Sequence, residues 1–219
     1  MGFIYRSDYY RIQDAVSELT AKVAIYAGKS TSEVRWFDYV AYTKEVLGYV
    51  YVYHDFGNVV GKRFYGSAQI LDGETVLIIN THASQNSGRI HFTTLHEIAH
   101  AYYHLQTHPY DTYSTNGSDN DTSLIEQEAD LMASFMLISD EAIFEVMKGG
   151  MTFKQMCNEF ECSYASLYVR LKNFLYSSSF AESYVVLNLL NKYRYQNDNT
   201  MVKYINKLRV NAIDYERYA

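Results

Sequence analysis

Two histidines separated by three residues, His96 and His100, form with Glu97 the pattern H-E-x-x-H. On a helix, side chains at positions i and i+4 lie on one face about 6 Å apart, so both imidazoles can reach a single zinc ion. Glu97 would then lie beside the open coordination position, where a carboxylate can take a proton from metal-bound water. The pattern therefore predicts a zinc hydrolase in which His96 and His100 bind the metal and Glu97 is the catalytic residue.

The sequence around this pattern favours a helix that follows a strand. Residues 74–80 form a β-branched apolar run typical of a strand, and from residue 92 onward apolar residues recur at helical spacing. Thr93 or Thr94 is the expected N-cap, because a threonine hydroxyl can accept a hydrogen bond from the first turn. We therefore expect both histidines on a helix that begins soon after a strand and a loop.

Catalytic zinc usually has three protein ligands and one water, so a third ligand must lie elsewhere in the chain. His104 continues the i, i+4 series, but it would lie about 12 Å along the helix axis from His96, too far to share one ion. We interpret His104 as a structural histidine or one that supports a ligand. The metzincin pattern requires a histidine at position 106, and Gln106 stands there instead.

A second helix is expected over residues 126–137, where apolar residues again recur at helical spacing. Glu126 and Asp130 share one face of this helix, whereas Glu128 lies about 200° around the axis from Glu126. We expect Glu126 to be the third zinc ligand. Asp130 is expected to accept a hydrogen bond from the far nitrogen of a ligating histidine, and Glu128 is the alternative acidic residue.

Residues 89–104, together with residues 126–130, resemble the ImmA/IrrE family of metallopeptidases. The resemblance covers roughly residues 49–175. It implies an α+β fold with a thermolysin-like minimal metallopeptidase core, in which a small antiparallel-rich sheet accompanies two zinc-binding helices. It also implies that a downstream glutamate completes the zinc site, and that the substrate is a transcriptional repressor cut at a specific bond. Two positions depart from the family: Asp130 stands where Asn is common, and Ser139 where Pro often follows.

The pattern of the whole chain indicates four parts. We expect an N-terminal helical segment (residues 1–48), the metallopeptidase core (49–150), a helix-turn-helix-like hairpin (151–176) and a tyrosine-rich helical tail (177–219). The additional helices at both ends would flank the core.

Within the core, the expected strands are residues 49–56, 62–71 and 74–80. Asp72 and Gly73 are a strong signal for a two-residue hairpin between the last two strands. If residues 76–80 form an exposed edge, an extended peptide could add to it and present its bond to the zinc. The polar stretch 112–121 is expected to be a loop near the cleft.

The composition indicates a cytoplasmic protein without a membrane anchor. The net charge of −6 and the isoelectric point near 5.6 argue against general attraction to nucleic acid. Cys157 and Cys162 form no CxxC pair, and two cysteines do not build a disulfide framework, so a reducing compartment is favoured. The N-terminus has no apolar signal region, and no stretch reaches the ~18 apolar residues that a membrane span needs.

The segment 151–176 leaves DNA binding open. Thr152 and Gln155 form a capping box, and Ser163 can cap a second helix, as in a helix-turn-helix. Its three basic residues face two acidic ones, which is little positive charge for binding phosphates. DNA binding is therefore possible but not favoured, and a helical hairpin packed on the peptidase is the other interpretation.

The preferred function is a zinc-dependent endopeptidase that cuts a specific intracellular protein, by resemblance a repressor of a phage, mobile element or stress response. One alternative is a helix-turn-helix regulator that binds DNA or protein and has a non-catalytic metal site. Another is a toxin-type or housekeeping peptidase. A tyrosine or histidine is also expected to stabilise the oxyanion; 23 tyrosines give no single candidate, and His54, His82 and His91 are weaker ones.

Overall fold

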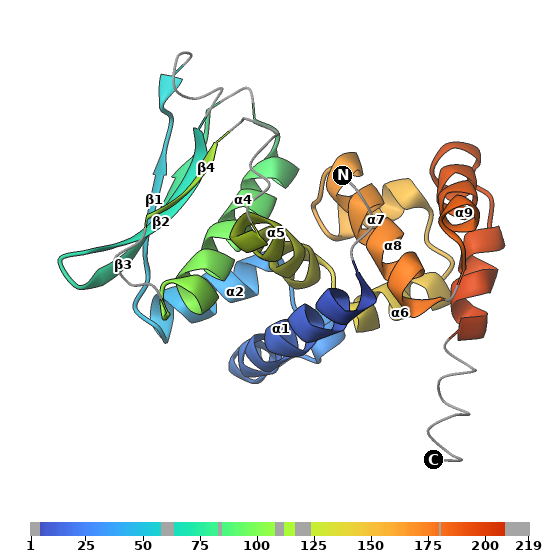
Figure 1. Ribbon diagram of the computed structural model, residues 1–219, viewed down its shortest axis with the longest axis horizontal. Helices are drawn as coiled ribbons and strands as arrows, with labels where there is room; N and C mark the ends of the chain where they lie inside the picture. Colours follow the sequence, from blue (N-terminus) through green and yellow to red (C-terminus); the bar gives the residue numbers. More distant parts are fainter. Residues whose placement is uncertain are drawn as a thin grey trace.

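The computed structural model describes residues 5–57, 64–82, 85–107, 112–116, 124–179 and 181–208. The elements follow one another as α1 (Arg6–Ala27), the 3-10 turn η1 (Thr31–Glu33), α2 (Trp36–Glu45), β1 (Val50–His54), β2 (Phe64–Leu71), β3 (Glu74–Asn80), α4 (Ser87–Ala99), the π-helix η2 (His100–His104), β4 (Tyr113–Asn116), α5 (Leu124–Leu137), α6 (Asp140–Lys148), α7 (Phe153–Glu159), α8 (Tyr164–Ser178), α9 (Ser183–Gln196) and a helix over residues 200–208. Figure 1 shows the sheet at one end of the molecule, α4 and α5 beside it, and α6 to α9 at the other end. The expected α+β class is confirmed.

The four described strands form a mixed sheet in the order β1-β3-β2-β4. β1 pairs with β3 in parallel, and the other two pairs are antiparallel. β2 and β3 are joined by Asp72 and Gly73, whose φ angles of 52° and 84° suit a tight hairpin turn, so the predicted hairpin is confirmed.

Two predictions about strands are wrong. β3 is not an edge, because its backbone pairs with β1 on one side and with β2 on the other, which leaves it unable to accept an added peptide. The polar stretch 112–121 is not all loop, because residues 113–116 form β4 against β2. Its residues 117–121 lie outside the described part of the chain. Among the described strands, β1 and β4 are the edges.

The helix that carries the histidine pair begins earlier than predicted. Asn86, not Thr93 or Thr94, is the N-cap of α4, and its side chain accepts a hydrogen bond from the backbone N–H of Arg89 at 2.9 Å. α4 packs against β2 and β3 and also against α5. Leu95 is fully buried at this junction, which fixes the turn that carries the histidine pair.

α5 is the second helix of the core, and its C-terminal half is buried from Leu131 to Leu137. α1 lies across α5, as Figure 1 shows, and also packs on α2. This arrangement is typical of a helix layer on one face of a sheet, and it holds the first turns of α5 beside the C-terminal end of α4.

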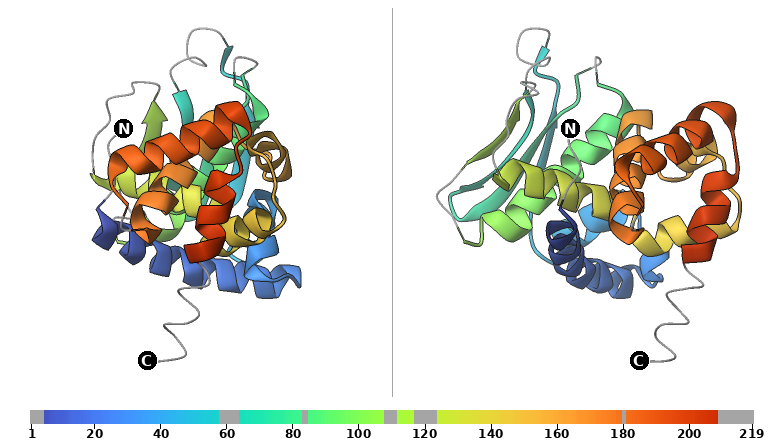
Figure 2. Two further views of the ribbon diagram at one scale, coloured as in Figure 1. Left: turned by 90° about the vertical axis from the view of Figure 1, so that its right-hand side faces the viewer. Right: turned by 45° about the vertical axis from the view of Figure 1, so that its right-hand side comes forward.

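The caps predicted for α7 and α8 are confirmed. Thr152 and Gln155 form the capping box of α7, and the Ser163 hydroxyl accepts a hydrogen bond from the backbone N–H of Ser166 at 3.0 Å. α9 covers α7 and α8 on the side away from the sheet, as Figure 2 shows. Asn197 ends α9 in the left-handed conformation.

A buried arginine links three of these elements. Arg170 of α8 is fully buried, donates to the carbonyl of Ile138 at 2.8 Å and to the Tyr9 hydroxyl at 2.9 Å, and forms an ion pair with Asp140. Because a buried charge without a partner is costly, this pair ties α8 to α1 and to the start of α6. Arg170 is therefore a structural residue and is not part of a basic surface.

Candidate metal centre and active site

Three side chains from α4, η2 and α5 converge beside the sheet. The Nε2 atoms of His96 and His100 lie 2.9 Å apart, and each lies 3.2 Å from a carboxylate oxygen of Glu126. Tetrahedral zinc with bonds of 2.0–2.1 Å keeps its donors about 3.3 Å apart, so these three donors fit one metal ion. Their ligand atoms all lie within 4.8 Å of one another, and the group is largely enclosed by protein.

The electrostatics of this group favour a cation. Burial opposes a charge on His96, but hydrogen bonds with Asp130 and Glu126 raise the pKa of its imidazole to about 10. Burial raises the pKa of Glu126, yet its hydrogen bonds to His100 and His96 lower that pKa to about 2. The pKa of His100 is lowered to about 4 by burial, so its imidazole is neutral and can donate a lone pair. The carboxylates that hold a proton on His96 can equally stabilise a metal ion.

Asp130 of α5 contacts the ring nitrogen of His96 that faces away from Glu126. Its Oδ1 is 3.0 Å from Nδ1 of His96, and because a carboxylate only accepts, the imidazole donates its Nδ1–H. When a metal ion replaces the second proton of this imidazole, the hydrogen bond to Asp130 leaves the Nε2 lone pair of His96 for the ion. Asp130 thus orients one histidine of the group and is not itself one of the three donors.

Glu97 is on α4, directly after the donor His96, and it is fully buried. Its side chain packs against β2 at Gly66, where a Cβ atom would come within 2.6 Å of Glu97 Oε1 and 2.8 Å of Thr93 Cγ2. Gly66 therefore allows α4 to approach the sheet closely enough to enclose the carboxylate.

Alanine at position 66 should disturb this contact. Gly66→Ala is expected to lower the free energy of unfolding by about 1–3 kcal/mol and to slow cleavage, because the new methyl group displaces Glu97. Chemical denaturation of the variant measures the first effect. Gly149→Ala is the matched control, because the nearest atom to its Cβ would be 3.5 Å away. A Gly66→Ala protein as stable and as active as the wild type would contradict this packing.

His104 and Glu128, the other two residues that the sequence offered for this site, lie close to the donors but outside the group of three. Nδ1 of His104 lies 2.9 Å from Nδ1 of His100, on the side of the ring away from Glu126. Glu128 forms an ion pair with Arg11 of α1 and reaches 3.6 Å from Nε2 of His104. Burial lowers the pKa of His104.

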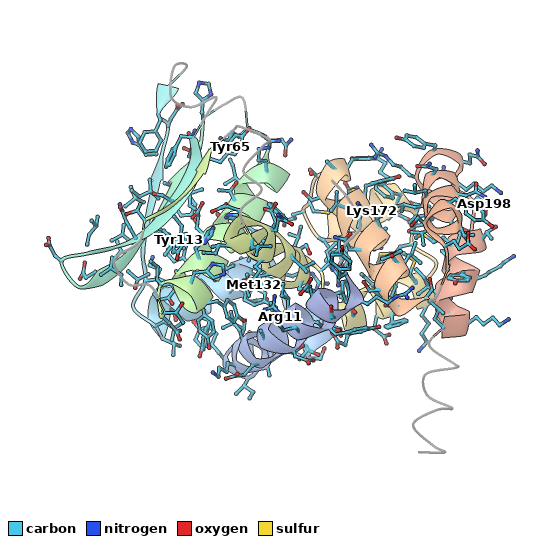
Figure 3. All side chains as sticks on the ribbon, in the orientation of Figure 1. Arg11, Tyr65, Tyr113, Met132, Lys172 and Asp198 are labelled. Atoms are coloured by element: carbon cyan, nitrogen blue, oxygen red, sulfur yellow. The ribbon has the colours of Figure 1, made fainter. Side chains whose placement is uncertain are left out.

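Tyr113 is a neighbour of this group that the sequence did not indicate. It is the first residue of β4, it is buried, and its ring stacks on the ring of His100 with centroids 4.5 Å apart and planes 9° from parallel. Figure 3 shows its side chain between the sheet and α4. It lies in a polar stretch without periodicity, so only the pairing of β4 with β2 brings it to the site.

The three histidines named as weaker oxyanion candidates have different surroundings. His91 stacks on Trp36 at 3.9 Å and contacts the carbonyl of Glu161 at 2.9 Å, so it serves the junction between α4 and the α7–α8 turn. His54 is exposed at the end of β1, and His82 is buried just after β3. None of the three is in the group of possible metal donors.

Comparison with known proteins identifies the family. The family model described as the IrrE N-terminal-like domain, a peptidase model, matches residues 44–172. The chain belongs to the ImmA/IrrE family. The match covers the whole described sheet, the three elements that carry the donors, α7 and the first part of α8, whereas α1 precedes it. Membership makes this ImmA/IrrE protein a peptidase, and the three donors give that peptidase a place for a metal.

No curated protein matches this ImmA/IrrE chain. Among the helices that the structure describes, none combines the length and the apolar character that crossing a membrane requires.

Proposed function

We propose that this protein is a zinc-dependent endopeptidase, with His96, His100 and Glu126 as zinc ligands and Glu97 as the catalytic residue. The observation that carries the proposal is the convergence of the two Nε2 atoms and the Glu126 carboxylate at 2.9–3.2 Å, with a buried carboxylate beside them. Two imidazoles and one carboxylate are the ligand set of a catalytic zinc site that keeps one position open.

The mechanism assigns a task to each side chain. When bound, zinc supplies an acidified water and a positive charge that polarises the peptide carbonyl. Glu97 takes a proton from the attacking water and later delivers it to the nitrogen of the leaving amine. Burial of Glu97 keeps bulk water away from this carboxylate, so the proton passes between the two reacting groups. Asp130 holds His96 in the orientation and tautomer that ligation needs.

β4 supports binding of an extended protein segment. It is an edge of the described sheet, and its first residue, Tyr113, contacts the ring of His100. A peptide that paired with the outer side of β4 would run past the three donors and expose one of its bonds to them. β4 thus takes the role that the sequence assigned to β3, and it favours a substrate with an unfolded or loop segment.

The substrate proposed from the family resemblance is a transcriptional repressor. A repressor encoded beside this gene is the first candidate, and the test is incubation of the two purified proteins with zinc, followed by mass spectrometry of the products. Two fragments from a single cut are expected. A set of many fragments from unrelated proteins would instead favour the housekeeping or toxin-type peptidase.

The structure gives no support to the alternative of a DNA-binding regulator. In a helix-turn-helix the second helix presents a face to the major groove, but α8 is buried on all sides from Arg170 to Leu175. Its basic residues Arg170 and Lys172 are both buried. The α7–α8 pair therefore packs on the peptidase core, and we keep protein cleavage as the proposed function.

A further inference from the structure

The π-helix that follows the second proposed ligand brings His104 into line with His100. In η2 the backbone N–H of Leu105 donates to the carbonyl of His100 at 2.9 Å, which widens the turn by one residue. The imidazoles of His100 and His104 consequently lie next to each other along the axis, with ring centroids 5.0 Å apart, planes tilted by 55° and Nδ1 atoms 2.9 Å apart. π-Helical turns of this kind occur frequently at functional sites.

The short Nδ1–Nδ1 distance defines the protons on both rings. Nε2 of His100 faces Glu126 and His96, so as a ligand it presents a lone pair there and carries its hydrogen on Nδ1. Among the residues that the structure describes, Nδ1 of His104 lies within hydrogen-bond distance of this Nδ1–H, so Nδ1 of His104 is its acceptor. His104 therefore accepts the Nδ1–H of His100, as Asp130 accepts the Nδ1–H of His96.

A second link connects His104 to the N-terminal helix. The remaining hydrogen of His104 is on Nε2, which is buried and has no hydrogen-bond partner in the described part of the chain. The nearest carboxylate is that of Glu128, whose Oε2 is 3.6 Å away. The other oxygen of Glu128 accepts a charge-assisted hydrogen bond from Arg11 at 2.5 Å. Figure 3 shows Arg11 on α1, which precedes the residues matched by the family model.

We infer that His104 is a positioning residue that fixes the tautomer and ring orientation of His100 for metal binding, and that Arg11 and Glu128 connect α1 to this histidine. The inference rests on the proposed metal site. The α1 helix is also held to η2 by the Tyr103 hydroxyl, which donates to the carbonyl of Ala15 at 2.8 Å. A displacement of α1 would therefore reach the metal through Glu128 and His104.

The test measures zinc affinity by competition with a chromophoric chelator, using the full-length protein. His104→Leu removes the acceptor and should raise the Kd for zinc by ~10–100-fold, the usual effect of losing a partner of a ligating histidine. His104→Asn should bind zinc nearly as well as the wild type, because its side-chain oxygen can occupy the position of Nδ1. Circular dichroism and thermal melting should show all these variants folded.

The connection from α1 to His104 is tested with a second pair of variants, one at Arg11 and a control at Lys22. Arg11→Gln should raise the zinc Kd by a smaller factor than His104→Leu, whereas Lys22→Gln should leave it unchanged, because the Lys22 ammonium contacts Glu18 and Tyr102 instead. The absorption spectrum of the cobalt-loaded protein should change in His104→Leu and Arg11→Gln but not in Lys22→Gln.

The outcomes separate the inference from the proposed function. If wild-type protein binds zinc and folded His104→Leu binds it equally tightly, the positioning role is wrong while the metal site stands. If His104→Leu does not fold, His104→Asn decides. A zinc Kd for His104→Asn that is ~100-fold higher than that of the wild type would refute the acceptor role. An unchanged Kd would support it. Failure of the wild type itself to bind zinc would overturn both the inference and the proposed function.

Discussion

Glu97→Gln is expected to slow cleavage by roughly 10²–10⁴-fold while the protein stays folded and keeps its metal. Glutamine has nearly the same shape and fills the same buried space against Gly66, but it cannot take a proton from water. Glu97 is not one of the three donors, so the affinity for metal should change little. The measurement is the rate of cleavage of a purified protein partner, with metal content determined on the same samples.

The control for this prediction is Glu145→Gln, which makes the same chemical change at an exposed position of α6 and should cut at the wild-type rate. Loss of metal in Glu97→Gln would show that Glu97 is a ligand and not a base. Undiminished cleavage by Glu97→Gln would show that another group removes the proton.

The second large effect is expected on the amount of bound zinc when a proposed ligand is replaced. Wild-type protein should hold about one zinc ion per chain, and His96→Ala, His100→Ala and Glu126→Ala should each reduce the bound zinc to a small fraction. Every one of these changes removes a donor from a group whose members lie 2.9–3.2 Å apart, and two donors hold zinc far less tightly than three. Elemental analysis of the purified variants measures the stoichiometry.

Asp130 and Glu128, the two other acidic residues near Glu126 on α5, provide comparison variants. Asp130→Ala should keep the donors but weaken zinc binding by ~10–100-fold, because His96 loses the partner of its Nδ1–H. Glu128→Ala should still bind one zinc ion, because Glu128 reaches the metal group only through His104. Stoichiometric zinc in Glu126→Ala together with its loss in Glu128→Ala would show that the wrong face of α5 had been assigned to the metal.

The local part of the fold could be predicted because its signals are local. The i, i+4 spacing places His96 and His100 on one helix face, and the same spacing relates Glu126 to Asp130. Capping residues predicted the start of α7 and of α8, and Asp72 with Gly73 predicted the hairpin. Each of these features depends on residues fewer than six positions apart.

Features that depend on contacts distant in sequence were missed. β4 forms because the polar residues from Tyr113 onward meet the free side of β2, and nothing in their own pattern indicates a strand. Tyr113 reaches the ring of His100, and Gly66 reaches Glu97, only through that sheet and its packing on α4. The π-helix that brings His104 to His100 replaced the regular helix that spacing alone had assumed.

Zinc dependence of the cleavage is the decisive property of the endopeptidase that we propose for this member of the ImmA/IrrE family. Purified protein is stripped of metal with a chelator, divided, and incubated with a candidate repressor with and without added zinc, and the intact masses of the products are recorded over time. Two fragments whose masses add up to that of the substrate plus one water molecule are expected, and only in the sample with zinc. A repressor that zinc-loaded protein binds but leaves intact, or one that the stripped protein cuts equally fast, would contradict it.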